Sequence, residues 1–406
     1  MSVSPVERAR GRWAALTLVT LCHIVGATAQ YGINTLAPFY QQDLELSRTQ
    51  IGLFFTAFYT GMAGLSFPAG WLADRLGVRT TTLNGHLFLG LFTLTASLAP
   101  SFPWALGSFF LAGLGYSFLN PASTRGVMAW FGPAERATAM GAKQTGVPAG
   151  GVVTALVAPL LVSWVGWRGA LAALGVSNLL FGFLFFALWR EPVRTVEHAR
   201  TEAGSAKITP AFNVQGLLAV SVGTSVLLVA QMALLTYTPL YLKETMGLSS
   251  YWASQALAVI QFGAMIGRVG WGLVSDRLFG GRRKVVLVLI GAISIMLCLA
   301  MGFMSPGTPA VLLLLVIFLA GLCMVGFQGV SYALIGELAG PAQTGAALGL
   351  VITVNSLGTI FGNPLFGYLV DRSGSYSIAW QSLAGVILVG IAALMVFLKE
   401  PRRGAS

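Results

Sequence analysis

The sequence has 406 residues, of which 56% are hydrophobic and only 9% are charged, and its mean hydropathy is +0.78. A soluble protein of this length would need far more charge, so the composition excludes the water-soluble globular class. The net charge of +11 would suit nucleic acid, but the basic residues gather in alternate loops and at the chain ends. That distribution indicates membrane topology and no nucleic-acid partner.

Apolar stretches recur along the chain, each close to the ~20 residues that a helix needs to cross the hydrocarbon core of a bilayer. Taken in chain order, the expected membrane helices are 13–38, 51–73, 80–99, 104–130, 138–162, 168–189, 213–241, 252–275, 284–304, 310–334, 344–370 and 379–398. Little of the chain remains for a soluble domain. The sequence therefore predicts an all-α membrane protein of twelve transmembrane helices, with the lipid bilayer as its surroundings.

The basic residues indicate how these helices are oriented. If both chain ends lie in the cytoplasm, 17 of the 24 Lys and Arg residues fall in cytoplasmic segments, four in the opposite loops and three within helices. This is the positive-inside bias, and it requires an even number of spans. We therefore expect a multi-pass protein of the cell inner membrane with both termini in the cytoplasm.

One long hydrophilic stretch divides the chain near its midpoint. It begins at REPVRTVEHAR and is followed by a further apolar helix. We expect an N-terminal six-helix bundle over 1–189, a cytoplasmic linker over 190–212 and a C-terminal six-helix bundle over 213–406.

The two halves are repeats of one another. The segment GWLADRLGVR in the first half is echoed by GLVSDRLFGGRRK in the second, which places Asp74 and Asp276 202 residues apart. Glu135 and Glu337 each follow 61 residues after those aspartates. Chance rarely keeps such a register, so the halves should be related by pseudo-symmetry.

These motifs resemble those of the major facilitator superfamily of secondary transporters over essentially the whole chain. The family signature Gly-x-Leu-Ala-Asp-Arg-x-Gly-x-Arg is matched by Gly70, Leu72, Ala73, Asp74, Arg75, Gly77 and Arg79. The sequence GVPAGG over 146–151 is similar to the glycine-proline motif of antiporters in that family. The resemblance implies two pseudo-symmetric six-helix bundles that act as a transporter and not as an enzyme, with no cofactor and no metal.

Polar side chains at helical spacing mark the first, fourth, seventh and tenth helices, which line the central cavity in that family. The residues that we expect to contact substrate there are Gln30, Asn34, Tyr116, Asn120, Gln231, Gln328 and Tyr332. The alternative is that such stripes only join helices to one another. His23 is a candidate to carry a coupling proton, because its ordinary pKa lies near physiological pH; the alternative is a packing role.

Three cations, Arg125, Lys143 and Arg268, fall within predicted helices, whereas no carboxylate does. This asymmetry predicts an anionic substrate, and the alternative is that each cation reaches the nearby interface. Arg268 shares a helix face with Gln261. Its surroundings, GRVGWGLVSDR, resemble the eighth helix of monocarboxylate and oxalate–formate carriers, where an arginine binds the carboxylate.

The other two cations carry weaker resemblances. Arg125 in NPASTRGVMAWF is similar to the fourth-helix arginine of organic anion–cation symporters. In a straight helix it points ~140° away from Asn120, so that only a kink at Pro121 would bring the two together. Lys143 lies in GAKQTGVPAGG, which is similar to a stretch of bacterial small-anion carriers.

Charged residues at the cytoplasmic ends of the helices are expected to form a gate. In the family, Asp-Arg loops and nearby Glu-Arg pairs make salt bridges that hold the outward-open state. The corresponding residues are Asp74, Arg75, Arg79, Glu135, Arg136, Asp276, Arg277 and Glu337.

The sequence thus predicts a secondary active transporter that moves a small organic anion by alternating access. A monocarboxylate is the favoured substrate, a proton or a counter-anion is the coupled partner, and the carrier is expected to be a monomer. The alternative is an exporter of hydrophobic or drug-like compounds, which the glycine-proline motif and the aromatic residues favour.

Overall fold

The computed structural model describes residues 5–131, 133–190, 214–339 and 344–398, which form helices joined by short connections. The first half contains α1 (Pro5–Thr35), α2 (Ala37–Asp43), α3 (Arg48–Ser97), α4 (Phe102–Tyr116), α5 (Leu119–Trp130), α6 (Pro133–Gln144) and α7 (Gly146–Leu188). The second half contains α8 (Val214–Glu244), α9 (Ser250–Arg277), α10 (Arg283–Phe303), α11 (Ala310–Ala320), the π-helical turn η1 (Gly321–Val325), α12 (Gln328–Ala339), α13 (Thr344–Ser373) and α14 (Tyr376–Phe397).

These helices build the twelve expected spans. Within α3 and α7 the chain turns back on itself at Gly77 (φ 77°) and Gly166 (φ 69°), backbone conformations that favour glycine. Each of these helices therefore holds two spans. The fourth span is α4 with α5, the fifth is α6 with the first part of α7, and the tenth is α11, η1 and α12. Eight helical segments among the described residues are long and apolar enough to cross a membrane by composition alone.

The first predicted helix, 13–38, differs from the structure at its end. Helix α1 stops at Thr35, and the chain restarts as the short α2. Pro38 lies in the first turn of α2, where backbone N–H groups have no acceptor within the helix, so its missing N–H costs no hydrogen bond. As a continuation of α1, Pro38 would have removed one helical hydrogen bond. The other predicted spans agree with the structure to within a few residues.

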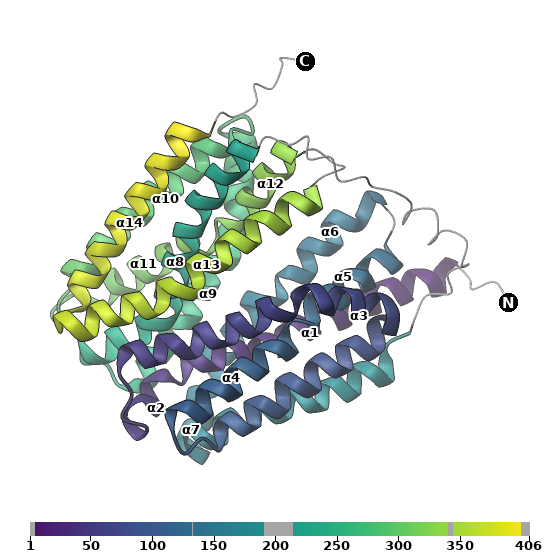
Figure 1. The fold of residues 1–406 in the computed structure, drawn as a ribbon, viewed down its shortest axis with the longest axis horizontal. Helices are drawn as coiled ribbons and strands as arrows, with labels where there is room; N and C mark the ends of the chain where they lie inside the picture. The colour runs from purple at the N-terminus through teal and green to yellow at the C-terminus, as the bar shows by residue number, and fades with distance from the viewer. Residues whose placement is uncertain (1–4, 132, 191–213, 340–343, 399–406) are drawn as a thin grey trace.

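The two halves lie side by side (Figure 1), and their main contacts run between α3 and α13 and between α7 and α9. Helix α1 begins and α14 ends at the same end of the molecule, which we call the terminal end. The opposite end, where α3 begins, we call the Arg48 end. The predicted linker of 190–212 lies outside the described residues except for Arg190, so the limits of the two bundles stay predictions.

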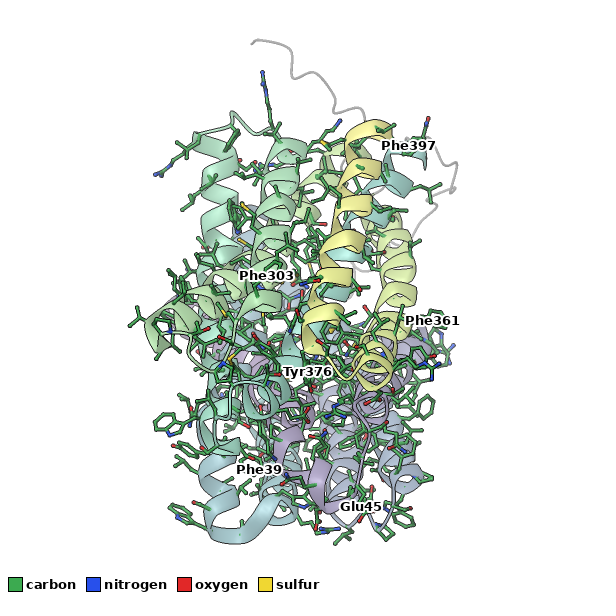
Figure 2. The ribbon with its side chains drawn as sticks, turned by 90° about the vertical axis from the view of Figure 1, so that its left-hand side faces the viewer. Phe39, Glu45, Phe303, Phe361, Tyr376 and Phe397 are labelled. Carbon is green, nitrogen blue, oxygen red and sulfur yellow. The ribbon has the colours of Figure 1, made fainter. Side chains whose placement is uncertain are left out.

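The outer surface of the helices is apolar. Phe303, Phe361 and Phe397 are 76%, 68% and 55% exposed (Figure 2). Large exposed apolar side chains along this many helices suit a lipid surrounding. Many polar side chains, in contrast, are buried between the helices.

Candidate substrate site and gates

Lys143, at the end of α6, is the centre of a polar cluster in the first half. Its side chain is only 1% exposed, and its ammonium donates hydrogen bonds to Asn120 Oδ1 (3.0 Å), Ser123 Oγ (3.1 Å) and Thr124 Oγ1 (2.6 Å). His23 Nε2 lies 2.8 Å from the same Ser123 hydroxyl. All three ammonium protons are therefore held by neutral oxygens, and the charge of Lys143 is buried.

The fourth span is bent one turn before Pro121. Its break falls at Ser117–Phe118, between α4 and α5, where the Ser117 carbonyl lacks the helical N–H donor that Pro121 cannot supply. Asn120 and Arg125 are both exposed on α5. Both residues therefore lie beyond the bend on one continuous helix, so the bend does not turn Arg125 toward Asn120, and the substrate-binding role of Arg125 stays a prediction.

Arg268 on α9 lies where the two halves meet. Its Nη1 donates to the backbone carbonyl of Gln144 in the first half at 3.3 Å. Four tyrosine side chains from the two halves, those of Tyr31, Tyr59, Tyr116 and Tyr332, lie near the guanidinium. Tyr116 and Tyr332 were predicted from the polar stripes, whereas Tyr31 and Tyr59 were not.

The predicted amides divide into two groups. Gln30 Nε2 donates to the Tyr59 hydroxyl at 2.6 Å, and Gln328 Nε2 donates to Gln231 Oε1 at 3.4 Å. Asn34 and Gln261 are fully buried; the amide atoms of Asn34 have no hydrogen-bond partner among the described residues, and the Gln261 amide faces the Tyr31 hydroxyl.

The described carboxylates lie away from this centre, at the ends of helices or in short connections. They belong to Asp43, Glu45, Glu135, Glu244, Asp276, Glu337 and Asp371. Among the described residues, neither Lys143 nor Arg268 has an ion pair with a carboxylate. The centre of the molecule therefore carries positive charge only.

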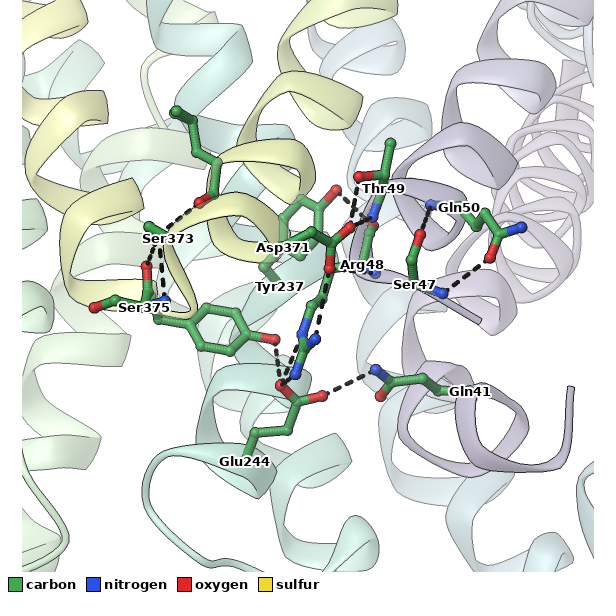
Figure 3. A network of polar contacts seen from close by, with 12 residues as sticks. Gln41, Ser47, Arg48, Thr49, Gln50, Tyr237, Glu244, Asp371, Ser373 and Ser375 are labelled. Atoms are coloured by element: carbon green, nitrogen blue, oxygen red, sulfur yellow. Dashed lines mark hydrogen bonds and ion pairs between the residues drawn. The ribbon is translucent and has the colours of Figure 1, made fainter. Parts of the chain in front are cut away.

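A network at the Arg48 end joins the two halves (Figure 3), and the sequence analysis missed it. The backbone N–H groups of Arg48 and Thr49 donate to the Asp371 carboxylate at 3.1 and 2.9 Å, and Thr49 Oγ1 donates at 2.6 Å. The Arg48 guanidinium bonds Glu244 at 2.8 Å and lies 3.5 Å from Asp371. Tyr237 hydrogen-bonds the Arg48 carbonyl at 3.2 Å.

Local sequence explains why this network forms. Ser47 caps α3, with a reciprocal hydrogen bond from its own N–H to the Gln50 side chain, so the first free N–H groups of α3 point out of the helix. A carboxylate at a helix N-terminus is stabilised by those N–H groups and by the helix dipole. Burial acts to raise the pKa of Asp371, but the hydrogen bonds from Thr49 and Arg48 and the charge of Arg48 outweigh it and lower that pKa.

The predicted gate residues at the terminal end pair within each half. Glu135 binds Arg12 at 2.8 Å in the first half. In the second half Arg283 binds Asp276 at 2.6 Å and Glu337 at 3.4 Å.

The remaining gate residues are on the surface or outside the described side chains. The guanidinium of Arg75 lies over the ring of Trp71, and that of Arg79 over Phe186, each 3.9 Å from the ring centroid. Arg277 is exposed at the end of α9, and the side chains of Asp74 and Arg136 fall outside the described set. Their role in a gate stays a prediction.

Two helical halves around a polar centre, surrounded by an apolar surface, define a polytopic membrane protein of the carrier class. Sequence comparison agrees, because residues 19–305 and 267–406 each match the Major Facilitator Superfamily. The chain belongs to this family, as the sequence motifs indicated, and it is a transporter and not an enzyme.

Similar proteins are found across the family. The hexuronate transporter of Bacillus subtilis is 26% identical over 399 residues, which cover 93% of each chain. A probable sulfoacetate transporter of Cupriavidus necator is 26% identical and covers 97% of this chain and 95% of its own. A bacterial homologue of the human lysosomal transporter Spinster, solved in an inward-facing and occupied conformation, superposes with a TM-score of 0.80 at 17% identity over all of both chains. At that identity the superposition shows the fold alone.

Proposed function

We propose that this protein carries a small organic anion across the membrane by alternating access and that Arg268 holds the carboxylate. The observation that supports this most is the place of Arg268, between the halves, bonded to a neutral carbonyl and without an ion pair among the described residues. A guanidinium presents two parallel N–H donors that match a carboxylate. The names of the two relatives, a hexuronate and a sulfoacetate transporter, also refer to anions.

The Lys143 cluster favours a substrate with one negative group. Because the three ammonium protons of Lys143 already bond neutral oxygens, it has no donor left for a second carboxylate. A monocarboxylate held by Arg268 fits this arrangement, and the exposed Asn120 and Tyr332 are available for its polar substituents.

The same cluster also bears on which ion is coupled to transport of the substrate. His23 shares the Ser123 hydroxyl with the Lys143 ammonium, so that protonating His23 would place two positive charges on one hydroxyl group. This geometry disfavours His23 as a proton carrier and leaves a counter-anion, or a proton carried by another group, as the coupled partner.

The cross-half network closes the Arg48 end, so the structure corresponds to the state that opens toward the terminal end. From the charge bias we assign the terminal end, with both termini, to the cytoplasm of a cell with an inner membrane, and we assign transport to the monomer. The buried native cysteines allow a test with an impermeant thiol reagent. Glu45→Cys should react in intact cells and Leu278→Cys only after permeabilisation; the reverse pattern would overturn the orientation.

Transport by purified protein in liposomes tests the substrate class. Labelled D-glucuronate, sulfoacetate and pyruvate are offered to the wild type, to Arg268→Lys and to Arg268→Ala. Arg282→Gln, which removes an exposed cation at a helix end, is the matched control. We expect the wild type and the control to take up a monoanion, D-glucuronate or pyruvate, in preference to sulfoacetate, which carries a second negative group. Uptake should fall by about tenfold in Arg268→Lys, because the two-pronged contact is lost, and should be absent in Arg268→Ala. Movement of lipophilic dyes, with no transport of or competition by the anions, would instead establish the exporter alternative.

A further inference from the structure

The motif over 146–151 brings α7 very close to two helices at once. A Cβ atom on Gly146 would lie 2.6 Å from the carbonyl oxygen of Thr20 on α1, and one on Gly151 would lie 2.6 Å from the Gln261 amide nitrogen on α9. The first contact lies within the N-terminal half, and the second crosses to the other half. Helix α7 is therefore part of the contact surface along which the halves meet.

Pro148, in the middle of this motif, changes the hydrogen bonding of the helix. A residue at 148 would normally donate its N–H to the carbonyl of Gln144, but proline has no N–H. The helical pattern resumes one residue later, where Ala149 N–H donates to the Thr145 carbonyl at 3.1 Å. The Gln144 carbonyl, left without its helical donor, accepts instead the Arg268 Nη1 hydrogen bond at 3.3 Å.

The contact between Arg268 and Gln144 is incomplete. Arg268 Nε is buried without a hydrogen-bond partner among the described residues. One long hydrogen bond to a neutral carbonyl satisfies a guanidinium poorly, whereas a carboxylate would take two charge-assisted bonds. An arriving carboxylate can thus displace the carbonyl.

We propose that the Gln144 carbonyl and the substrate carboxylate compete for Arg268, and that Pro148 makes this competition possible by freeing the carbonyl. The proposal rests on the proposed function, in which Arg268 binds the substrate. In the empty carrier the bond ties α9 to the α6–α7 junction and stabilises the state closed at the Arg48 end. Substrate binding removes this tie between the halves, which lowers the barrier to rearrangement. Pro148 is a positioning residue, because it acts through the Gln144 carbonyl.

The first test needs no ligand. Spin labels on Leu76→Cys and Leu278→Cys, exposed residues related by the 202-residue register, report the separation of the halves at the terminal end. Pro148→Ala should restore the helical bond of Gln144 and turn its carbonyl back along the helix. We expect Pro148→Ala and Arg268→Ala each to raise by about threefold the fraction of molecules in which the labels at 76 and 278 are close together, which is the state closed at the terminal end.

The double variant decides whether the two residues act through one contact. If they do, Pro148→Ala combined with Arg268→Ala gives no larger change than either substitution alone. Pro159→Ala, which removes the other proline within α7, is the matched control and should leave the distances unchanged. An unchanged distance distribution in Pro148→Ala, or effects that add in the double variant, would overturn the proposal.

Binding of D-glucuronate then separates this inference from the proposed function. If the wild type binds D-glucuronate, Pro148→Ala should bind it about three- to tenfold more tightly, because no carbonyl has to be displaced; an unchanged Kd would count against the competition while the proposed function stands. If the distance changes occur but neither D-glucuronate, sulfoacetate nor pyruvate binds the wild type, the contact exists, and both the carboxylate role of Arg268 and the competition are wrong.

Discussion

Two cations within the helices, the buried Lys143 and the partly exposed Arg268, have different surroundings in this protein. Lys143 has its three donors satisfied by side chains of the neighbouring α5, whereas Arg268 reaches across to the other half and holds only one carbonyl. The first arrangement fixes helices α5 and α6 to one another. The second leaves donors for a solute. Only the second is suited to a step in which the partner is exchanged.

Lys143→Ala tests this difference. The substitution removes three charge-assisted hydrogen bonds and leaves a cavity, so we expect the free energy of unfolding to fall by about 2–4 kcal/mol. Arg268→Ala should leave it nearly unchanged, since that side chain has a single bond to lose. Thermal unfolding of the two variants in detergent is the measurement. A stable Lys143→Ala variant that has lost anion binding would show instead that Lys143 contacts the substrate.

At the scale of the helix, close packing depends on residues without a side chain. Gly150 in α7 faces the Ile24 carbonyl of α1 so closely that a Cβ atom there would overlap with it, whereas Gly141, in α6 of the same span, has open space around it. Backbone atoms cannot move aside as a side chain can. Gly146 and Gly150, four residues apart on one face of α7, thus mark the contact with α1.

A pair of matched substitutions follows from these surroundings. Gly150→Ala should lower the free energy of unfolding by about 1–3 kcal/mol, because α1 and α7 must separate to admit the methyl group. Gly141→Ala should raise it slightly, by up to about 1 kcal/mol, because alanine favours the helix. Melting temperatures of the two variants, measured side by side, check both signs. Equal effects would mean that the close contact at Gly150 does not limit stability.

The sequence was sufficient to predict most helices, but not their interruptions. Spacing and hydropathy located the spans, because each needs a continuous apolar stretch. The breaks between α1 and α2, between α4 and α5, and around η1 lie inside such stretches. Pro38 was a local sign of the first, and Pro121 was a local sign of the second, because a proline leaves the carbonyl four residues before it without a helical donor. The π-helical turn contains no proline, so it depends on packing against other helices.

At the scale of the whole molecule, the two ends differ in whether their ion pairs join the two halves or lie within one half. At the Arg48 end, Arg48, Glu244 and Asp371 join the halves. At the terminal end, Glu135 and Asp276 bind cations of their own half. The sequence could reveal the terminal residues, because the repeat aligns them. It could not reveal the pairing of Thr49 with Asp371, which are 322 residues apart and occupy non-equivalent places in the two repeats.

The lowered pKa of Asp371 gives this closed end a defined pH dependence. The carboxylate contact is fully present above the ordinary aspartate value of about 3.8 and is lost as the pH falls through the lowered value. The distance between labels at positions 76 and 278 should therefore stay constant between about pH 5 and 8, outside this titration. Asp371→Asn should shift it toward the shorter distance at every pH in that range.

Asp43→Asn is the control for this measurement. Asp43 pairs with Arg168 within the first half, and that contact lowers its pKa as well. Losing it should not alter the separation of the halves. A distance that changes in the wild type between pH 8 and 5 would show that another group controls the closed end.

The cation-only centre has an electrical consequence. Moving one elementary charge through a membrane potential changes the free energy by about 2.3 kcal/mol per 100 mV. A bound monoanion cancels one of the two positive charges of Lys143 and Arg268, so the loaded centre carries one charge through that field and the empty centre carries two. We therefore expect the voltage across the membrane to act more strongly on the empty carrier than on the loaded one, so that an energised cell sets the direction in which the empty site faces.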